Sequence, residues 1–266
     1  AAFVQGLFEW YRRSDFRGEL VIADASSSSH QLRSSIARSR WPFEWKVVSV
    51  PKTPELTTAN SMNEAFRAGL SVADRQWSIL SCDDDLLLVD TIERGQRLLS
   101  STSEFVSVCG DRFFYNVFEQ RLQSASRYFA FRSIPFSQRA RNIQAPTEHS
   151  RLIEYLRREM FHTMFSLTST RVWLSVVPSD PIQQEFPSFA ADFRWMLGIV
   201  ARGPLAALGA PLTISLKHGK NLSLGGSYAR WGHPAETWEE EEEKFVQYLT
   251  ELLKGSVEKE AVESRA

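Results

Sequence analysis

Residues 78–90 read SILSCDDDLLLVD: an apolar run, three consecutive aspartates and a second apolar run. Adjacent carboxylates repel one another, and near a core they also lose hydration. A bound cation would offset this repulsion, and so would exposure of Asp83, Asp84 and Asp85 to water. The two interpretations are therefore a metal site and an acidic turn or helix cap.

Two more apolar runs precede this stretch and predict the fold class. Residues 19–24 (ELVIAD) end in Asp24, and residues 46–51 (KVVSVP) end in a proline. With residues 77–82 these runs predict three strands, and apolar residues at helical spacing predict helices over 2–13, 29–39 and 60–73. Strands that begin at residues 19, 46 and 77 are spaced like βαβ units, and uninterrupted apolar strands are typical of parallel sheets. The sequence predicts an α/β fold with a mostly parallel central sheet and helices on both faces.

The second half of the chain continues the alternation less regularly. Helices are predicted over 90–101, 150–160, 190–203 and 235–255, and strands over 104–110 and 210–219. Residues 162–177 are predicted to be a strand that runs into a helix. The arginine-rich residues 111–150 are interpreted as an insertion or flap, and the tail after Gly255 as frayed. These elements predict three parts: residues 1–110, residues 111–234, and a C-terminal helix and tail over 235–266.

Composition narrows the class of protein. Of the 266 residues, 43% are hydrophobic and 24% charged, which is ordinary for a soluble globular protein. A formal net charge of −1 gives no indication of a nucleic-acid partner. Two cysteines, Cys82 and Cys109, cannot build a disulfide framework, which favours a reducing compartment. The sequence has no 18-residue apolar run and no signal peptide, so we expect no transmembrane segment and a cytoplasmic location, free or at the inner face of the membrane.

Four stretches of the chain carry a resemblance to a known family. FVQGLFEWYRRSDFRGELVIADASS (3–27) and SMNEAFRAGLSVADRQWSILSCDDD (61–85) are similar to the early helices, the second strand and the Asp-x-Asp metal motif of nucleotide-sugar-dependent glycosyltransferases of the GT-A (Rossmann-like) fold. RLIEYLRREMFHTMFSLTSTRVWL (151–174) and FAADFRWMLGIVARG (189–203) resemble the later part of a bacterial glycosyltransferase-domain group associated with surface polysaccharides. The strand that opens GT-A domains has no counterpart ahead of residue 3, which is a departure from the family.

The resemblance implies a metal-dependent enzyme that transfers a sugar from a nucleotide-diphosphate donor to a hydroxyl acceptor, either a saccharide or a lipid-linked one. Its implied metal, Mn²⁺ or Mg²⁺, would be bound by Asp83, Asp85 and His218. Carboxylate oxygens suit such hard cations, and neutral imidazole is also a competent ligand. A lone histidine after a strand more often has a structural or surface role.

The implied contacts to the nucleotide sugar follow the same resemblance: Asp24, Asp83, Asp84 and Lys220. Lys217 and Lys220 would neutralise the leaving diphosphate, although loop lysines are usually only solvated. The arginines between residues 121 and 158 either form a basic face for an anionic acceptor or are ordinary surface residues.

Asp192 is the candidate general base, because it opens a helix where inverting GT-A enzymes place this carboxylate. The role requires an ionised carboxylate near the acceptor hydroxyl, and a helix amino end favours ionisation. The alternative for Asp192 is a plain helix cap. Ala191 stands where the family often has a second acidic residue.

Two other classes of protein compete with this prediction. One is a non-catalytic GT-A-like module that binds a sugar or a protein, which the absent first strand and Ala191 favour. The other is a methyltransferase, which needs a glycine-rich turn after its first strand that this sequence lacks. A serine hydrolase would need a GxSxG elbow, and none is present.

Overall fold

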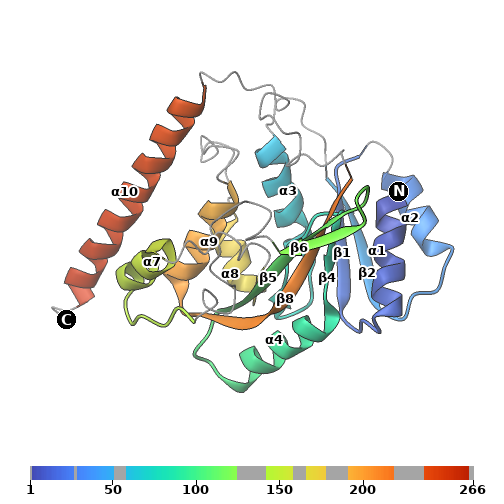
Figure 1. Cartoon of the computed structure of the whole chain (residues 1–266), viewed down its shortest axis with the longest axis horizontal. Coiled ribbons are helices and arrows are strands. Elements are labelled where there is room, and N and C mark those ends of the chain that lie inside the picture. The colour runs from blue at the N-terminus through green and yellow to red at the C-terminus, as the bar shows by residue number, and fades with distance from the viewer. Residues whose placement is uncertain are drawn as a thin grey trace.

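The computed structural model describes residues 2–26, 29–50, 58–124, 142–157, 166–177, 191–218 and 237–263. Within these ranges the chain alternates helices and strands (Figure 1). The helices are α1 (Ala2–Arg13), α2 (Ser29–Ala37), α3 (Thr58–Ser71), α4 (Val89–Ser101), α7 (Glu148–Arg157), α8 (Thr170–Val176), α9 (Ala191–Arg202) and α10 (Thr237–Glu263). The strands are β1 (Glu19–Asp24), β2 (Glu44–Ser49), β3 (Trp77–Ser78), β4 (Asp85–Leu87), β5 (Ser107–Asn116), β6 (Arg121–Ser124), β7 (Leu167–Ser169) and β8 (Leu205–Lys217).

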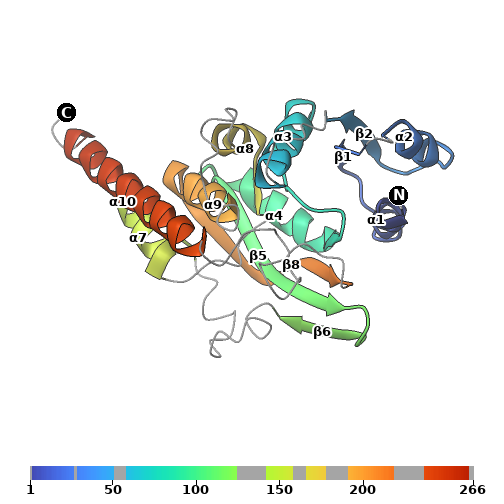
Figure 2. The ribbon, with the colours of Figure 1, turned by 90° about the horizontal axis from the view of Figure 1, so that it is seen from above.

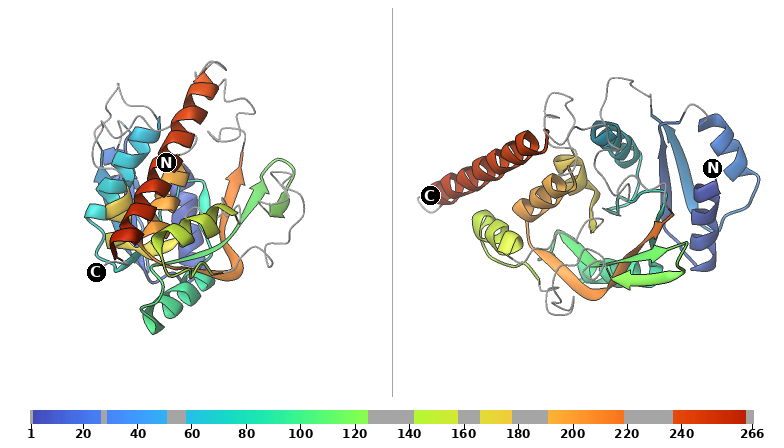
Figure 3. Two further views of the ribbon diagram at one scale, coloured as in Figure 1. Left: turned by 90° about the vertical axis from the view of Figure 1, so that its left-hand side faces the viewer. Right: turned by 45° about the horizontal axis from the view of Figure 1, so that its top comes forward.

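The first two strands form a parallel pair covered on both faces. Figure 3 shows α1 and α2 on one side of β1 and β2, with α3 on the other. Leu20 and Ile22 pack in the cluster that contains Phe8 of α1. Val21 points the other way, so that a Cβ built on Gly69 of α3 would lie 3.7 Å from its Cγ1. This alternation is that of a strand covered on both faces, as its apolar sequence predicts.

The remaining six strands form a mixed sheet. Its order is β3-β7-β5-β8-β4, with β6 paired to β5 at the side. Among the strands that the structure describes in this sheet, β5 and β8 pair in parallel, and the other pairings are antiparallel. The α/β class is therefore confirmed, but this sheet is not the mostly parallel one that the sequence predicts. β4 and β7 have three residues each, too few for periodicity to reveal their direction.

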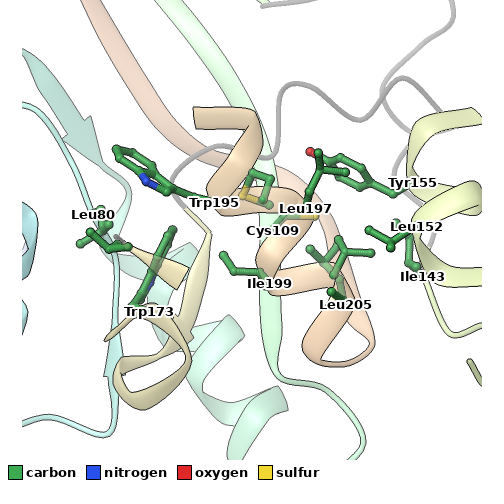
Figure 4. Packing of buried hydrophobic residues seen from close by; sticks show 14 of the residues in the cluster. Leu80, Cys109, Ile143, Leu152, Tyr155, Trp173, Trp195, Leu197, Ile199 and Leu205 are labelled. Carbon is green, nitrogen blue, oxygen red and sulfur yellow. The ribbon is translucent and has the colours of Figure 1, made fainter. Parts of the chain in front are cut away.

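Helices cover both faces of this mixed sheet, as predicted. On one face Leu99 of α4 packs against Val108 and Ala206. On the other face Cys109 and Leu205 join the largest core cluster, with the inner sides of α7, α8 and α9. Figure 4 shows Trp173 of α8 and Trp195 of α9 in that cluster. α10 and α7 lie at one end of the molecule and α1 and α2 at the other (Figure 2).

Two sequence predictions about the second half are wrong. Residues 111–150 are not simply a flap: β5 continues to Asn116 and turns into β6, and Phe114 and Ile143 are buried. The second correction is at the C-terminus, where α10 continues past Gly255 to Glu263 instead of fraying. A Cβ on Gly255 would meet nothing within 4 Å, and the next residue, Ser256, is buried and bonds to His149 of α7.

Within the described ranges, none of the helices combines the length and the apolar character that crossing a membrane requires.

Candidate functional site

The pairing of β4 with β8 places acidic and cationic side chains next to one another. Asp85 lies opposite Ser215, and the Leu216 N–H donates to the Asp84 carbonyl at 2.9 Å. The aspartates of the opening sequence stretch are therefore held beside Lys217, the last residue of β8, and His218, which follows it. Backbone pairing of β4 with β8 sets this register and brings the two groups together.

Asp85 is the most buried of the three aspartates, with an exposed fraction of 1%. Its Oδ1 accepts hydrogen bonds from Ser215 Oγ and from Arg112 Nη2, the latter at 3.3 Å. Its Oδ2 accepts a long bond, 3.4 Å, from the Cys82 N–H. The Arg112 guanidinium pairs with Asp85 through Oδ1, so Oδ2 is the oxygen that could contact a ligand.

Ligand atoms of Cys82, Asp84 and Asp85 lie within 4.8 Å of one another. Two carboxylates at this spacing fit a hard divalent cation such as Mn²⁺ or Mg²⁺, whereas the Cys82 thiol is a softer ligand that these ions do not prefer. The grouping differs from the predicted one, because Asp83 is exposed and is not part of it. Asp84 takes the place beside Asp85 that the sequence suggested for Asp83.

Two basic side chains adjoin this carboxylate pair. His218 Nε2 lies 3.6 Å from Asp84 Oδ2, close to the predicted metal site. Lys217 is buried, with its Nζ 4.5 Å from the centroid of the Phe114 ring. Burial and, to a smaller extent, Arg112 lower the pKa of Lys217 from 10.5 to about 8, although Asp85 opposes the shift. Burial has removed hydration from this amine, so a phosphate ligand stabilises its charged form more than it stabilises that of a solvated lysine.

Asp24 is the last residue of β1, as predicted, and its two carboxylate oxygens have different surroundings. Its Oδ1 accepts a bond from the Ser26 N–H at 2.9 Å. Its Oδ2 is buried and has no hydrogen-bond partner among the residues that the structure describes. Buried polar atoms are nearly always hydrogen-bonded, so this oxygen is a candidate acceptor for a ligand donor. Its neighbour Ala23 borders the same cavity as Cys82 and Asp83.

The last two predicted site residues are only partly placed. Asp192 lies in the first turn of α9, as the sequence predicts, but its side chain is outside the described part of the chain. Lys220 falls wholly outside the described residues. Their roles as general base and as nucleotide contact stay predictions. Sequence reasoning missed Arg112 and Ser215, because neither stands near the aspartates in the chain.

Another buried carboxylate, Asp111, lies on β5 beside Arg112. Desolvation raises the pKa of Asp111 from 3.8 to about 6, although a hydrogen bond from the Arg112 N–H opposes the shift. The folded state therefore binds more protons than the unfolded state between these two values. Stability is lost as the pH rises through this window and stays lost above about pH 6.

We expect Asp111→Asn to raise the melting temperature at pH 7.5 and to lose this advantage at pH 4.5, because the amide carries no charge to desolvate. Thermal melting at both pH values measures the effect. Asp74→Asn is the contrasting control: Lys46 lowers the pKa of this exposed carboxyl, so its removal should act weakly and in the opposite direction at pH 7.5. An equal effect of Asp111→Asn at both pH values would contradict a raised pKa of Asp111 in the folded protein.

A scan of the chain against protein-family models matched no family, and a search of curated proteins found no match.

Proposed function

We propose that this protein is a glycosyltransferase of GT-A type that binds a nucleotide-diphosphate sugar together with Mn²⁺ or Mg²⁺ and transfers the sugar to a hydroxyl acceptor. The observation that carries the proposal is the pairing of β4 with β8. It brings the Asp84 and Asp85 carboxylates to the end of β8, where His218 Nε2 lies 3.6 Å from Asp84 Oδ2 and the Lys217 amine interacts electrostatically with both aspartates. Carboxylates suit a cation and a buried amine suits an anion, so a metal-bound diphosphate satisfies both at once.

Each described residue has a distinct part in this proposal. Asp84 and Oδ2 of Asp85 would hold the cation, which would neutralise the diphosphate and stabilise it as a leaving group. Lys217 would contact the diphosphate. Arg112 and Ser215 hold Asp85 in place, and Asp24 accepts a hydrogen bond from the nucleoside through its Oδ2.

The rest of the fold supports the same class. A parallel β1–β2 unit and a mixed sheet with helices on both faces are compatible with a GT-A domain, and the candidate ligands gather at strand ends, where α/β proteins bind nucleotides. Asp192 on α9 would remove the proton from the acceptor hydroxyl, which corresponds to inversion at the sugar carbon. The proposed acceptor is a saccharide or a lipid-linked hydroxyl at the cytoplasmic face of the membrane.

The first test is a thermal-shift screen with UDP, GDP, CMP, CDP and their sugars, each with and without Mn²⁺. A ligand that binds only the native state raises the melting temperature by mass action. We expect one nucleotide to shift the melting temperature only when Mn²⁺ is present, and Asp84→Asn to abolish that shift. Asp90→Asn, an exposed aspartate of α4, is the matched control. No metal-dependent shift with any nucleotide would contradict the proposal.

A second candidate function is a non-catalytic module that binds a sugar nucleotide without turning it over. The ion pair between Asp85 and Arg112 favours it, because this carboxylate is compensated without any metal. One assay separates the two candidates. The binding module binds its nucleotide without Mn²⁺ and releases no nucleoside diphosphate from a sugar donor. The enzyme releases nucleoside diphosphate from that donor.

Lys217→Met is expected to change affinity and stability in opposite directions. A hydrogen bond to a charged group contributes about 1.5–3 kcal/mol, so loss of the amine should weaken nucleotide binding about tenfold or more. The protein without ligand should melt at the same or a higher temperature, because a buried cation is replaced by an apolar chain of similar length. Titration calorimetry measures the affinity for the nucleotide, and thermal melting without ligand measures the stability. Lys254→Met, at an exposed position of α10, is the control, and unchanged affinity would remove Lys217 from the site.

A further inference from the structure

The turn that joins β5 to β6 presents apolar side chains to water. Phe118 is 75% exposed, Val117 is 43% exposed, and Leu122, near the start of β6, is 53% exposed. We call residues 117–122 the hairpin tip. The other large apolar side chains that are exposed in the described part of the chain are valines spread along α10. Apolar side chains that gather at one exposed place indicate a contact surface, whereas scattered ones do not.

The hairpin tip stands out from the body of the protein on a fixed stem. Figure 2 and the left view of Figure 3 show the β5–β6 hairpin extending away from the helices. On the stem, Phe114 is buried and pairs with Ser215 of β8. The Val117 N–H donates to the Lys217 carbonyl at 2.9 Å. The hairpin tip therefore begins directly beside the candidate site.

The first backbone donors of the turn are satisfied within the protein. The Asn116 side-chain oxygen accepts bonds from the Phe118 N–H at 3.0 Å and from the Glu119 N–H at 3.2 Å. The Val117 N–H has the Lys217 carbonyl. A backbone donor that loses water without gaining a partner is strongly unfavourable in an apolar medium. These bonds therefore reduce the free-energy cost of moving the hairpin tip out of water.

Size, shape and charge favour a lipid surface over a protein as the partner. The three apolar side chains expose on the order of 300 Å², whereas a stable protein–protein interface buries about 800 Å² on each partner. A projecting tip also needs a matching hollow in a protein, but it needs none in a fluid bilayer. Glu119 and Arg121 carry opposite charges, so the apolar side chains dominate the interaction.

We propose that the hairpin tip inserts into the interfacial region of a lipid bilayer, with Phe118 as the main anchor and Val117 and Leu122 beside it. Tyr115 lies opposite Leu122, so its amphipathic ring is on the same face of the hairpin. An anchor of this size gives weak, reversible binding. Insertion would bring Lys217 and the carboxylate pair to the membrane surface.

This inference goes beyond the proposed function and does not require it. Under the proposed function, insertion would present the candidate site to a lipid-linked hydroxyl acceptor. Binding to a bilayer needs no nucleotide and no metal, whereas the thermal-shift screen needs no lipid. Failure of one proposal is therefore distinguishable from failure of the other.

The test is flotation of the 266-residue chain with lipid vesicles, without nucleotide, at low and at high salt. One set of vesicles is phosphatidylcholine alone, and the other also contains phosphatidylglycerol. The variants are Phe118→Ser, Phe118→Trp and Val117→Ser. Val246→Ser, at an exposed valine of α10, is the matched control for Val117→Ser. Sedimentation at several concentrations without lipid is measured on the same proteins.

We expect the unsubstituted protein to bind both sets of vesicles with little dependence on salt. Phe118→Ser should weaken binding at least about tenfold, because it removes the largest part of the apolar surface that enters the bilayer. Phe118→Trp should keep the affinity, since tryptophan is favoured at membrane interfaces. Val117→Ser should weaken binding more than Val246→Ser does.

Three results would overturn the proposal. The first is no binding to either set of vesicles, or equal binding by the unsubstituted protein and Phe118→Ser. The second is binding only to vesicles with phosphatidylglycerol that high salt abolishes, which would assign the contact to basic residues. The third is a concentration-dependent dimer that Phe118→Ser dissociates, which would mean that the hairpin tip contacts a second copy of the chain.

Discussion

Replacing Asp85 with alanine is expected to remove the metal dependence of nucleotide binding and to reduce sugar transfer at least about 100-fold. A bound divalent cation stabilises the transition state by several kcal/mol, and about 1.4 kcal/mol corresponds to a factor of ten in rate. Asp85 is also the group that Arg112 and Ser215 hold in place. Its removal therefore takes away a ligand oxygen and also the hydrogen bonds that Arg112 and Ser215 make to it. Release of nucleoside diphosphate from the donor identified by the screen, with Mn²⁺ present, measures the loss.

This substitution also leaves the Arg112 guanidinium without its carboxylate, so a loss of folding has to be separated from a loss of chemistry. Asp85→Asn keeps the shape and a hydrogen-bond acceptor for Arg112, and should stay folded while losing the metal dependence. Asp83→Asn is the most informative comparison, because Asp83 is exposed and outside the carboxylate group. Full activity in Asp85→Asn would disprove the metal assignment, and full activity in Asp83→Asn would support the grouping seen in the structure.

Replacing Arg151 with alanine is expected to lower the free energy of unfolding by about 3 kcal/mol or more. The Arg151 guanidinium donates to the carbonyls of Val200 and Ala201 in the last turn of α9, at 2.9 and 2.8 Å. It also donates to the carbonyls of Ala145 and Pro146. Each buried acceptor left without a donor costs about 1–3 kcal/mol, and the cation also complements the helix dipole of α9.

Urea denaturation followed by circular dichroism measures this loss. Arg157→Ala, at an exposed position on the same helix, should change stability by no more than about 0.5 kcal/mol. Arg151→Lys should fall between the two, because a single ammonium cannot reach carbonyls on both α9 and the loop before α7. A loss in Arg151→Ala no larger than in Arg157→Ala would show that α9 does not depend on this contact.

Local sequence predicted the elements whose signal lies within a few residues. β1 spans residues 19–24, as its apolar run and closing aspartate indicate, and α1 spans the predicted 2–13. The strand that runs into a helix at 162–177 appears as β7 followed by α8. Each of these signals is a periodicity or a cap that the chain carries in one stretch.

What local sequence could not predict depends on residues far apart in the chain. Arg112 is charged, yet it lies in a strand, because its partners Asp85 and Ser215 are on β4 and β8. That polar composition made residues 111–150 look like a flap. The same limit applies to the site: the triplet 83–85 indicated where carboxylates gather, but which of them turns inward depends on the register of β4 with β8.

The position of β8 in the fold also bears on the rate at which a ligand associates. Its first residue, Leu205, is fully buried in the main core, and its last, Lys217, reaches the candidate site. The strand pairs with β5 from Leu205 to Lys217, with an irregularity near Asp111, and with β4 at residues 213–215. A ligand arriving at Lys217 and Asp84 therefore meets groups that the core already holds in position. Association at this part of the site should be limited by diffusion and orientation, with no slow ordering step before it.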